Sequence, residues 1–85
     1  MRAKVFVSLK KTVLDPQGQT IHAALSGLGY TGVTGVRQGK YFDVTLADNL
    51  TPEDARTEIE KIARDVLTNP VIEEYSFTVQ QKQEE

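Results

Sequence analysis

The sequence lacks cysteine and tryptophan and contains a single histidine, His22. Without cysteine, disulfide bonds and thiolate metal sites are excluded. A single histidine also excludes a histidine-rich metal site, although a Ser-His-Asp triad remains formally possible. The chain has only 85 residues, and a single domain of this size buries only about 60–65% of its extended-chain surface. Because neither disulfides nor such metal sites can add stability, we expect the domain to depend on a partner.

Long apolar runs are also missing. No apolar stretch approaches the ~20 residues that a membrane-spanning helix requires, so we expect no membrane partner. The N-terminal sequence MRAKVFVSLKK lacks the apolar core of a secretory signal. A chain without cysteine gives no reason to expect an oxidising compartment. We therefore expect the protein in the cytoplasm.

Charge is nearly balanced in total but unevenly distributed along the chain. The formal net charge is −2, and nearly all of the acidic residues lie in the second half, whereas most of the basic residues lie in the first. A surface with two signs of charge can orient a protein partner. Solvated acidic helix faces are the simpler interpretation, because sequence halves need not be spatial halves. The acidic total and the lack of interleaved sheet aromatics favour no nucleic-acid partner.

The first half of the chain predicts a strand, a helix and a weaker strand. Residues 4–9 alternate between apolar and polar side chains, which is typical of a half-buried strand. Asp15 and Pro16 are a predicted N-cap and first helical residue. An apolar stripe follows at helical spacing, and a left-handed C-cap is expected at Gly29. Residues 31–37 predict a strand bent at glycines, and a hairpin turn is expected at 38–40. The apolar stripe of the predicted helix consists of Ile21, Ala24, Leu25 and Leu28.

The second half repeats this order. Residues 41–47 alternate clearly and predict a strand. Thr51 and Pro52 are a strong helix start, and the apolar stripe that follows runs to Asn69-Pro70, where the helix should end. Residues 71–79 predict a last strand. We therefore expect one domain over residues 1–79 and a polar C-terminal tail over 80–85.

The predicted order β-α-β-β-α-β indicates an α+β, ferredoxin-like fold. In this fold one antiparallel four-stranded sheet carries two helices on one face and leaves the other face open. Phe6, Tyr41 and Ile72 are candidates for the open face. Exposed aromatic residues there favour oligomerisation through the sheet surface or its edges. The alternative, that they are single surface residues without a partner, is equally open.

The chemical motifs that the sequence offers have simpler structural interpretations. Residues 27–32 match G-x-G-x-x-G, but they follow a helix and lead into a strand, which is the reverse of a dinucleotide site. The acidic residues of the second predicted helix alternate with basic ones at i,i+4 spacing, as on a solvated helix face. We therefore expect no catalytic residue, and no cofactor or metal bound by this chain.

Three segments resemble the PurS subunit family of phosphoribosylformylglycinamidine synthase, and the resemblance extends over residues 2–79. They are residues 9–18 (LKKTVLDPQG), 36–42 (VRQGKYF) and 67–75 (LTNPVIEEY). Each segment alone is weak evidence. The three in this order, in a chain of this length, are specific.

The resemblance implies a role in a divided enzyme of de novo purine biosynthesis. A large synthetase subunit of the PurL type uses ATP and Mg to convert formylglycinamide ribonucleotide to the amidine. A glutaminase subunit of the PurQ type releases ammonia from glutamine. The small subunit has no active site, forms a homodimer or higher oligomer between the other two, and supports ammonia transfer. These subunits, and a second copy of the chain, are the expected partners.

Under this interpretation, rigid turns and basic side chains are the expected partner contacts. Proline stiffens a turn, glycine permits a tight one, and basic side chains reach carboxylates on a partner. Turn chemistry and simple solvation are the competing explanations for the same residues. The candidates are Lys10, Lys11, Asp15, Pro16, Arg37, Gly39 and Lys40.

A second function remains an alternative. Small ligand-sensing regulatory modules of the ACT type share the β-α-β-β-α-β order and bind small molecules between dimerised domains. The glycine-rich turn at residues 27–32 is compatible with such a module.

Overall fold

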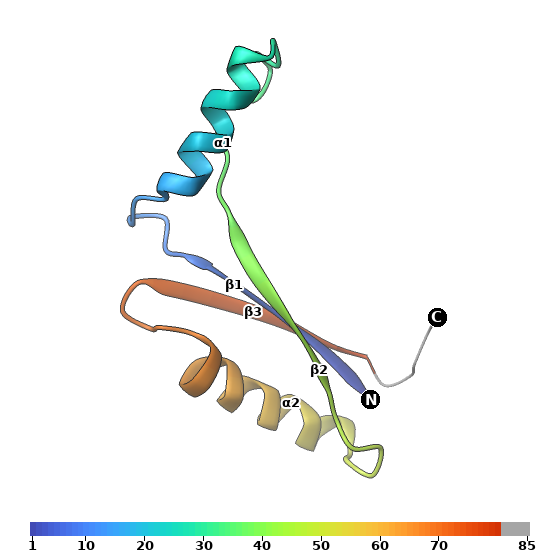
Figure 1. The fold of residues 1–85 in the computed structure, drawn as a ribbon. Helices are drawn as coiled ribbons and strands as arrows, with labels where there is room; N and C mark the ends of the chain where they lie inside the picture. Colours follow the sequence, from blue (N-terminus) through green and yellow to red (C-terminus); the bar gives the residue numbers. More distant parts are fainter. Residues whose placement is uncertain (81–85) are drawn as a thin grey trace.

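The computed structural model describes residues 1–80, which form three strands, two α-helices and one π-helical turn (Figure 1). Gln80 ends the last strand, and the rest of the predicted polar tail, residues 81–85, lies outside the described residues. The elements are β1 (Arg2–Leu9), α1 (Pro16–Gly27), β2 (Gly39–Thr45), α2 (Pro52–Ile62), η1 (Ala63–Leu67) and β3 (Glu73–Gln80).

Within residues 1–80, the strands form one antiparallel sheet in the order β2-β1-β3. Val5 at the centre of β1 lies opposite Phe42 on β2 and Phe77 on β3. All three therefore share one face of the sheet, because neighbouring strands place paired residues on the same side. The predicted alternation of these strands is confirmed, and the apolar set faces α2.

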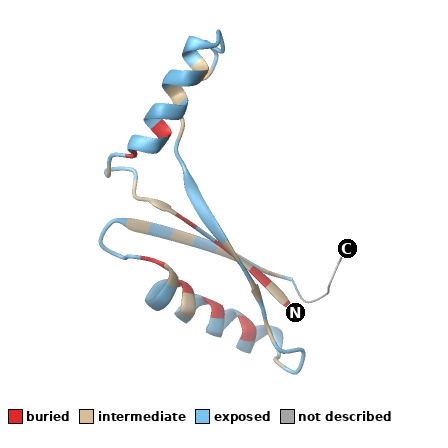
Figure 2. Cartoon of the chain, in the orientation of Figure 1, coloured by how far each residue is buried: buried red, intermediate tan, exposed pale blue. Residues whose placement is uncertain are grey.

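The core lies between this face of the sheet and α2. Thr51 accepts a hydrogen bond from the amide of Asp54 at 3.0 Å and caps α2, and Pro52 follows as the first helical residue. Ala55, Ile59 and Ala63 then recur every four residues and are completely buried. Figure 2 shows the buried residues concentrated on β1 and α2. The helix continues through η1 and ends before Thr68, whose backbone is extended.

The first helix does not pack on the sheet, which differs from the predicted fold. Residues 10–38, which we call the arm, project from one end of the sheet (Figure 1). The chain runs out along α1 and returns beside it. His22 Nε2 donates to the carbonyl oxygen of Val33 at 2.9 Å, and the amide of Tyr30 donates to that of Leu25 at 3.0 Å. Gly29, at the tip, has φ 98°, as predicted for the residue after a helix.

The predicted strand at 31–37 and the hairpin turn at 38–40 are wrong for the described residues. Residues 33–38 are assigned to no strand, and Gly39 already lies opposite Ser8 in the sheet. Because no turn separates the segment from β2, it cannot fold back and pair with it. Both edges of β1 are already occupied by β2 and β3. The sheet therefore has three strands rather than four, and one helix on its face rather than two.

The resulting shape is elongated. The radius of gyration is 16.4 Å, whereas a compact chain of this length has about 12 Å. The arm accounts for the difference and leaves apolar side chains in solvent: Leu28 is 73% exposed and Tyr30 59% exposed. Among residues 1–80, neither α-helix has the length and apolar character needed to span a bilayer.

Candidate functional site

The place where the arm leaves the sheet gathers most of the residues that the sequence singled out. We call it the joint and define it as residues 9–18 of the outgoing chain and residues 36–39 of the returning chain. The sheet, α1 and the start of β2 all meet here. Its contacts are polar, in contrast to the apolar contacts between the sheet and α2.

Asp15 is the centre of the joint. Its side chain caps α1 by accepting from the amide of Gly18 at 3.0 Å, and its second oxygen accepts from the amide of Gln38 at 2.6 Å. The residue is only 4% exposed. The hydrogen bonds from Gln38 and Gly18 and the nearby charge of Arg37 lower the pKa of Asp15 below its ordinary value of 3.8. The carboxylate is therefore charged at neutral pH and connects the two passes of the chain.

Arg37 binds the outgoing chain from the returning one. Its Nη2 donates to the carbonyl oxygens of Lys10 at 2.9 Å and Val13 at 3.0 Å, with a longer contact of 3.4 Å to that of Leu9. These contacts use one nitrogen of the guanidinium group for backbone oxygens of its own chain. The structure therefore gives Arg37 an internal role at the joint, which sequence reasoning did not assign.

Two glycines allow the chain passes to approach closely. A Cβ atom on Gly18 would lie 2.3 Å from the carbonyl oxygen of Val36, and one on Gly39 would lie 2.8 Å from that of Val7. Neither distance is compatible with a side chain unless the backbone moves. Gly39 therefore serves the close approach of β2 to β1 rather than the tight turn that the sequence predicted.

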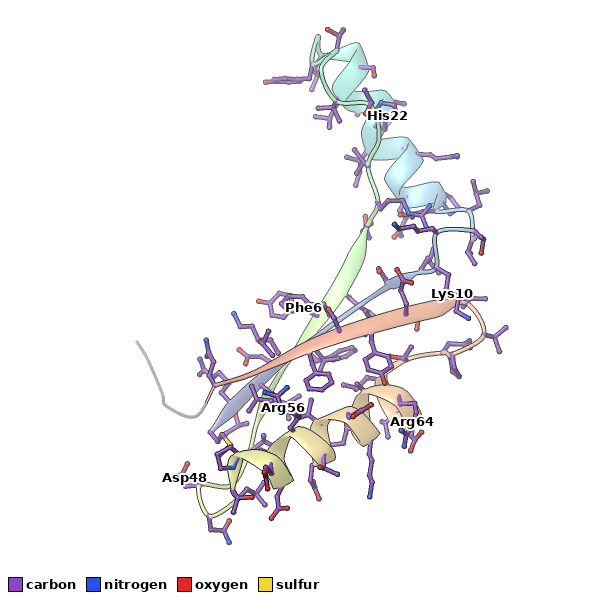
Figure 3. All side chains as sticks on the ribbon, turned by 180° about the vertical axis from the view of Figure 1, so that it is seen from behind. Phe6, Lys10, His22, Asp48, Arg56 and Arg64 are labelled. Atoms are coloured by element: carbon purple, nitrogen blue, oxygen red, sulfur yellow. The ribbon has the colours of Figure 1, made fainter. Side chains whose placement is uncertain are left out.

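The remaining predicted contact residues lie at the surface around the joint. Lys11 and Pro16 are exposed, and Lys10 is half-buried, with its amide donating to the carbonyl oxygen of Ile72 at 2.8 Å. Figure 3 shows Lys10 at the end of the sheet from which the arm projects. Lys40 Nζ lies 3.8 Å from the Glu73 carboxylate.

Sequence reasoning missed two residues of this region. Gln38 contributes its backbone amide to Asp15, and its side chain donates to Gln17 Oε1 at 2.6 Å. Glu73 accepts from the amide of Asn69 at 2.8 Å and so fixes the turn before β3. For the Glu73 contact, the one available sequence signal was an acidic residue four positions after Asn69. No local pattern indicates the contact between Gln38 and Asp15, because these residues are far apart in the sequence.

The face of the sheet opposite α2 is open, as predicted for Phe6 and Tyr41. Their ring centroids lie 6.0 Å apart, and Lys4 Nζ lies 5.6 Å from the Tyr41 centroid. Figure 3 shows Phe6 on the side of the sheet away from α2. A shallow depression on this face is lined by Phe6, Tyr41, Glu74 and neighbouring residues. Ile72, the third candidate, is exposed in the turn before β3 and not on the sheet.

The described residues offer no assembled catalytic centre. Residues 1–80 contain no group of three or more His, Asp or Glu side chains placed to hold a metal ion. His22 binds a backbone carbonyl oxygen on the arm, far from the joint (Figure 3). The described residues thus define a small α+β protein: a three-stranded sheet with one covered face and an arm that projects from a polar joint.

Comparison with known proteins identifies the family. The family model of PurS, described as phosphoribosylformylglycinamidine (FGAM) synthase, matches residues 2–81. The phosphoribosylformylglycinamidine synthase subunit PurS of Mycobacterium leprae is 47% identical over 77 residues, which are 91% of this chain and 92% of that protein. This chain belongs to the PurS family of FGAM synthase subunits.

Solved structures agree with this assignment. PurS of Methanocaldococcus jannaschii superimposes with a TM-score of 0.84 at 36% identity, over 96% of this chain and 98% of that one. A chain in the structure of PurLQS from Thermotoga maritima gives a TM-score of 0.79 at 29% identity, over 91% of this chain and 93% of that one. The α+β fold with the projecting arm is therefore similar to that of experimentally determined PurS chains.

Proposed function

We propose that this chain is the non-catalytic subunit that joins a glutaminase subunit and a large synthetase subunit in FGAM synthase. The observation that carries the proposal is its similarity, over 91% of the chain, to a chain in the structure of PurLQS. The whole complex converts formylglycinamide ribonucleotide to formylglycinamidine ribonucleotide in de novo purine biosynthesis. The ligand-sensing alternative has no comparable support.

The chemistry of the complex explains why such a subunit is needed. Ammonia released from glutamine must reach the synthetase site before it escapes into water, where it is protonated and loses its nucleophilicity. A subunit that holds two active sites in a fixed relation supports this transfer by positioning and by excluding water. ATP, Mg and glutamine belong, in this proposal, to the partner subunits, and this chain binds no cofactor.

We also propose that a second copy of the chain covers the arm. Segment 33–38 is extended, was predicted as a strand, and runs directly into β2. Val33 and the Gln38 amide already bond within the arm, and the other backbone groups of the segment need a partner when water is excluded. Beside it, Ile21, Leu28 and Tyr30 are exposed. Pairing of this segment with a second copy supplies the fourth strand of the ferredoxin-like sheet and buries these side chains.

The basic residues around the joint are the proposed contacts with the other subunits. Lys11 and Pro16 are exposed, and Lys40, at the start of β2, lies at the end of the sheet where β1 leads into Lys10. Carboxylates on a partner are suitable ligands for these side chains. We place the complex in the cytoplasm, where ATP and glutamine are available to its other subunits.

Reconstitution tests the function. The chain is mixed with its large and glutaminase subunits, and amidine formation is measured with glutamine and, separately, with ammonium salt as the nitrogen source. We expect omission of the chain to abolish most of the glutamine-driven rate and to leave the ammonium-driven rate of the large subunit largely intact. Equal glutamine-driven rates with and without the chain would falsify the proposal.

A further inference from the structure

The arm and the sheet are joined by two passes of the chain and by few apolar contacts. Apolar side chains of the joint remain accessible to solvent: Leu14 is exposed and Val13 is half-buried. The orientation of the arm therefore does not follow from a hydrophobic core. It must come from the polar contacts that cross between the two passes.

Two charged side chains make crossing contacts in opposite directions, beside the neutral contact in which Gln38 Nε2 donates to Gln17 Oε1 at 2.6 Å. Asp15 belongs to the outgoing pass and accepts from the amide of Gln38 on the returning pass at 2.6 Å. Arg37 belongs to the returning pass and donates to the Lys10 and Val13 carbonyl oxygens on the outgoing pass, at 2.9 and 3.0 Å. Each contact involves a charged group, and such hydrogen bonds are stronger than those between neutral groups.

The contacts also act at different points. Asp15 fixes the start of α1 to the start of β2, since Gln38 directly precedes Gly39. Arg37 fixes the connection between β1 and α1, which without it is a loop. Hydrogen bonds at two separate points restrict both the swinging and the twisting of the arm relative to the sheet. A hydrogen bond at one point would leave the arm free to rotate about that point. The close approach of Gly18 to the Val36 carbonyl oxygen further restricts this motion.

We propose that Asp15 and Arg37 are positioning residues that lock the arm at one angle to the sheet. This lock, rather than direct contact with a partner, is how they serve glutamine-driven synthesis, a step that rests on the proposed function. A subunit that places two enzymes relative to each other needs a stiff connection between its own parts. The joint supplies that stiffness without an apolar core.

The absence of cysteine permits a direct measurement of the arm angle. Spin labels are attached at two introduced cysteines, Gly32→Cys near the arm tip and Thr45→Cys at the far end of β2, and the distance between them is measured by pulsed electron resonance. A Cβ at position 32 meets nothing within 4 Å, so the label is tolerated. Labelled chain is diluted with unlabelled chain, so that distances between copies do not contribute.

Two variants each remove one of the two sets of hydrogen bonds between the outgoing and the returning chain. Asp15→Asn keeps a good N-cap for α1 but removes the charged acceptor of the Gln38 amide. Arg37→Met keeps the apolar stem and removes the donors. We expect either change to raise the population of other arm orientations about tenfold or more, because a hydrogen bond to a charged group is lost. Arg64→Met is the matched control. Arg64 Nε lies 2.9 Å from the carboxylate of its neighbour Asp65, and both residues belong to η1 rather than to the joint.

The reconstituted complex gives the second readout. We expect both joint variants, but not the control, to lower the glutamine-driven rate while the ammonium-driven rate stays unchanged. Distance distributions as narrow as those of the unchanged chain would overturn the lock. Broadened distances with an unchanged glutamine-driven rate would overturn the positioning role. Should the complex work equally well without the chain, the proposed function fails, and the distances alone decide whether the joint is locked.

Discussion

The sheet with α2 and the arm are stabilised by different forces. In the first region, Val5, Ile59 and Ala63 are completely buried between the sheet and the helix. In the second, Gly18 is the only buried residue of α1, and the arm is held by His22, Asp15 and Arg37 through hydrogen bonds to backbone groups. Burial of apolar side chains is the main stabilising contribution in the first region. The second leaves apolar side chains such as Leu28 and Tyr30 exposed.

The largest expected effect separates these two regions. Ile59→Ala removes a side chain that is completely buried at the centre of the core. We expect the free energy of unfolding to fall by about 2–5 kcal/mol, the usual cost of an isoleucine-to-alanine change in a core. Chemical denaturation measures it. Val66→Ala, at a side chain that is 73% exposed on η1, is the control and should cost less than about 0.5 kcal/mol. Similar costs for the two changes would contradict the placement of the core.

Local patterns predicted the first region well. The strands predicted at residues 4–9, 41–47 and 71–79 are present, and their pairing places Val5, Phe42 and Phe77 on one face. The caps Asp15 and Thr51 were also predicted, because a cap is decided by residues within one helical turn. In each case the information lies within a few residues of the chain.

The arm could not be predicted in the same way. Residues 31–37 have the composition of a strand, but both edges of β1 are occupied, and the segment runs into β2 without the turn that would let it fold back along that strand. The amide of Gln38, where a turn was predicted, instead donates to Asp15, which is distant in sequence, and β2 begins at the next residue. Likewise Arg37 was predicted as a partner contact because its backbone partners cannot be read from a pattern.

The next effect concerns two glycines of the same helix. Gly18→Ala places a Cβ 2.3 Å from the Val36 carbonyl oxygen, so the joint must open. We expect a loss of about 1–3 kcal/mol, as for other overpacked sites. Gly27→Ala meets nothing within 4 Å and should be neutral or stabilise the helix by up to about 1 kcal/mol. Thermal unfolding of the two variants compares them directly.

The Gly18→Ala and Gly27→Ala variants also test whether close packing at the joint is required for the fold. If Gly18→Ala is as well tolerated as Gly27→Ala, the close contact between the two chain passes is not required for the fold. The joint would then be looser than the hydrogen bonds of Asp15 indicate.

A third prediction tests what covers the arm. Ile21→Glu introduces a charge into the exposed apolar stripe of α1. If a second copy buries this stripe, the dissociation constant of the dimer should rise about tenfold or more, because the charge must be desolvated. Sedimentation velocity measures the change, and circular dichroism should show an unchanged fold. Val66→Glu is the matched control, since it places the same charge on an exposed valine outside the arm. A wild-type chain that is monomeric at micromolar concentration would contradict the proposed dimer.

The smallest effect is a pH dependence confined to the joint. The pKa of Asp15 lies below its ordinary value of 3.8, chiefly because of the hydrogen bonds from the Gln38 and Gly18 amides. A lowered pKa in the folded state means that the carboxylate stabilises the fold at pH values above that ordinary value. This stabilisation is lost as the pH falls through the lower, folded-state pKa. The arm should therefore loosen on the acidic side only.

Nuclear magnetic resonance can follow this change at the two amides themselves. The Gln38 and Gly18 amide protons should shift together as Asp15 is protonated, while the amide of Tyr30, which donates to the carbonyl oxygen of Leu25 and has no acidic neighbour in the sequence, serves as an internal reference. In Asp15→Asn the pH-dependent shift of both amide protons should disappear, because the titrating carboxyl group is gone. A persistent shift in this variant would show that Asp15 is not the responsible group, and it would contradict a pH response that the geometry of the Asp15 hydrogen bonds places in the joint.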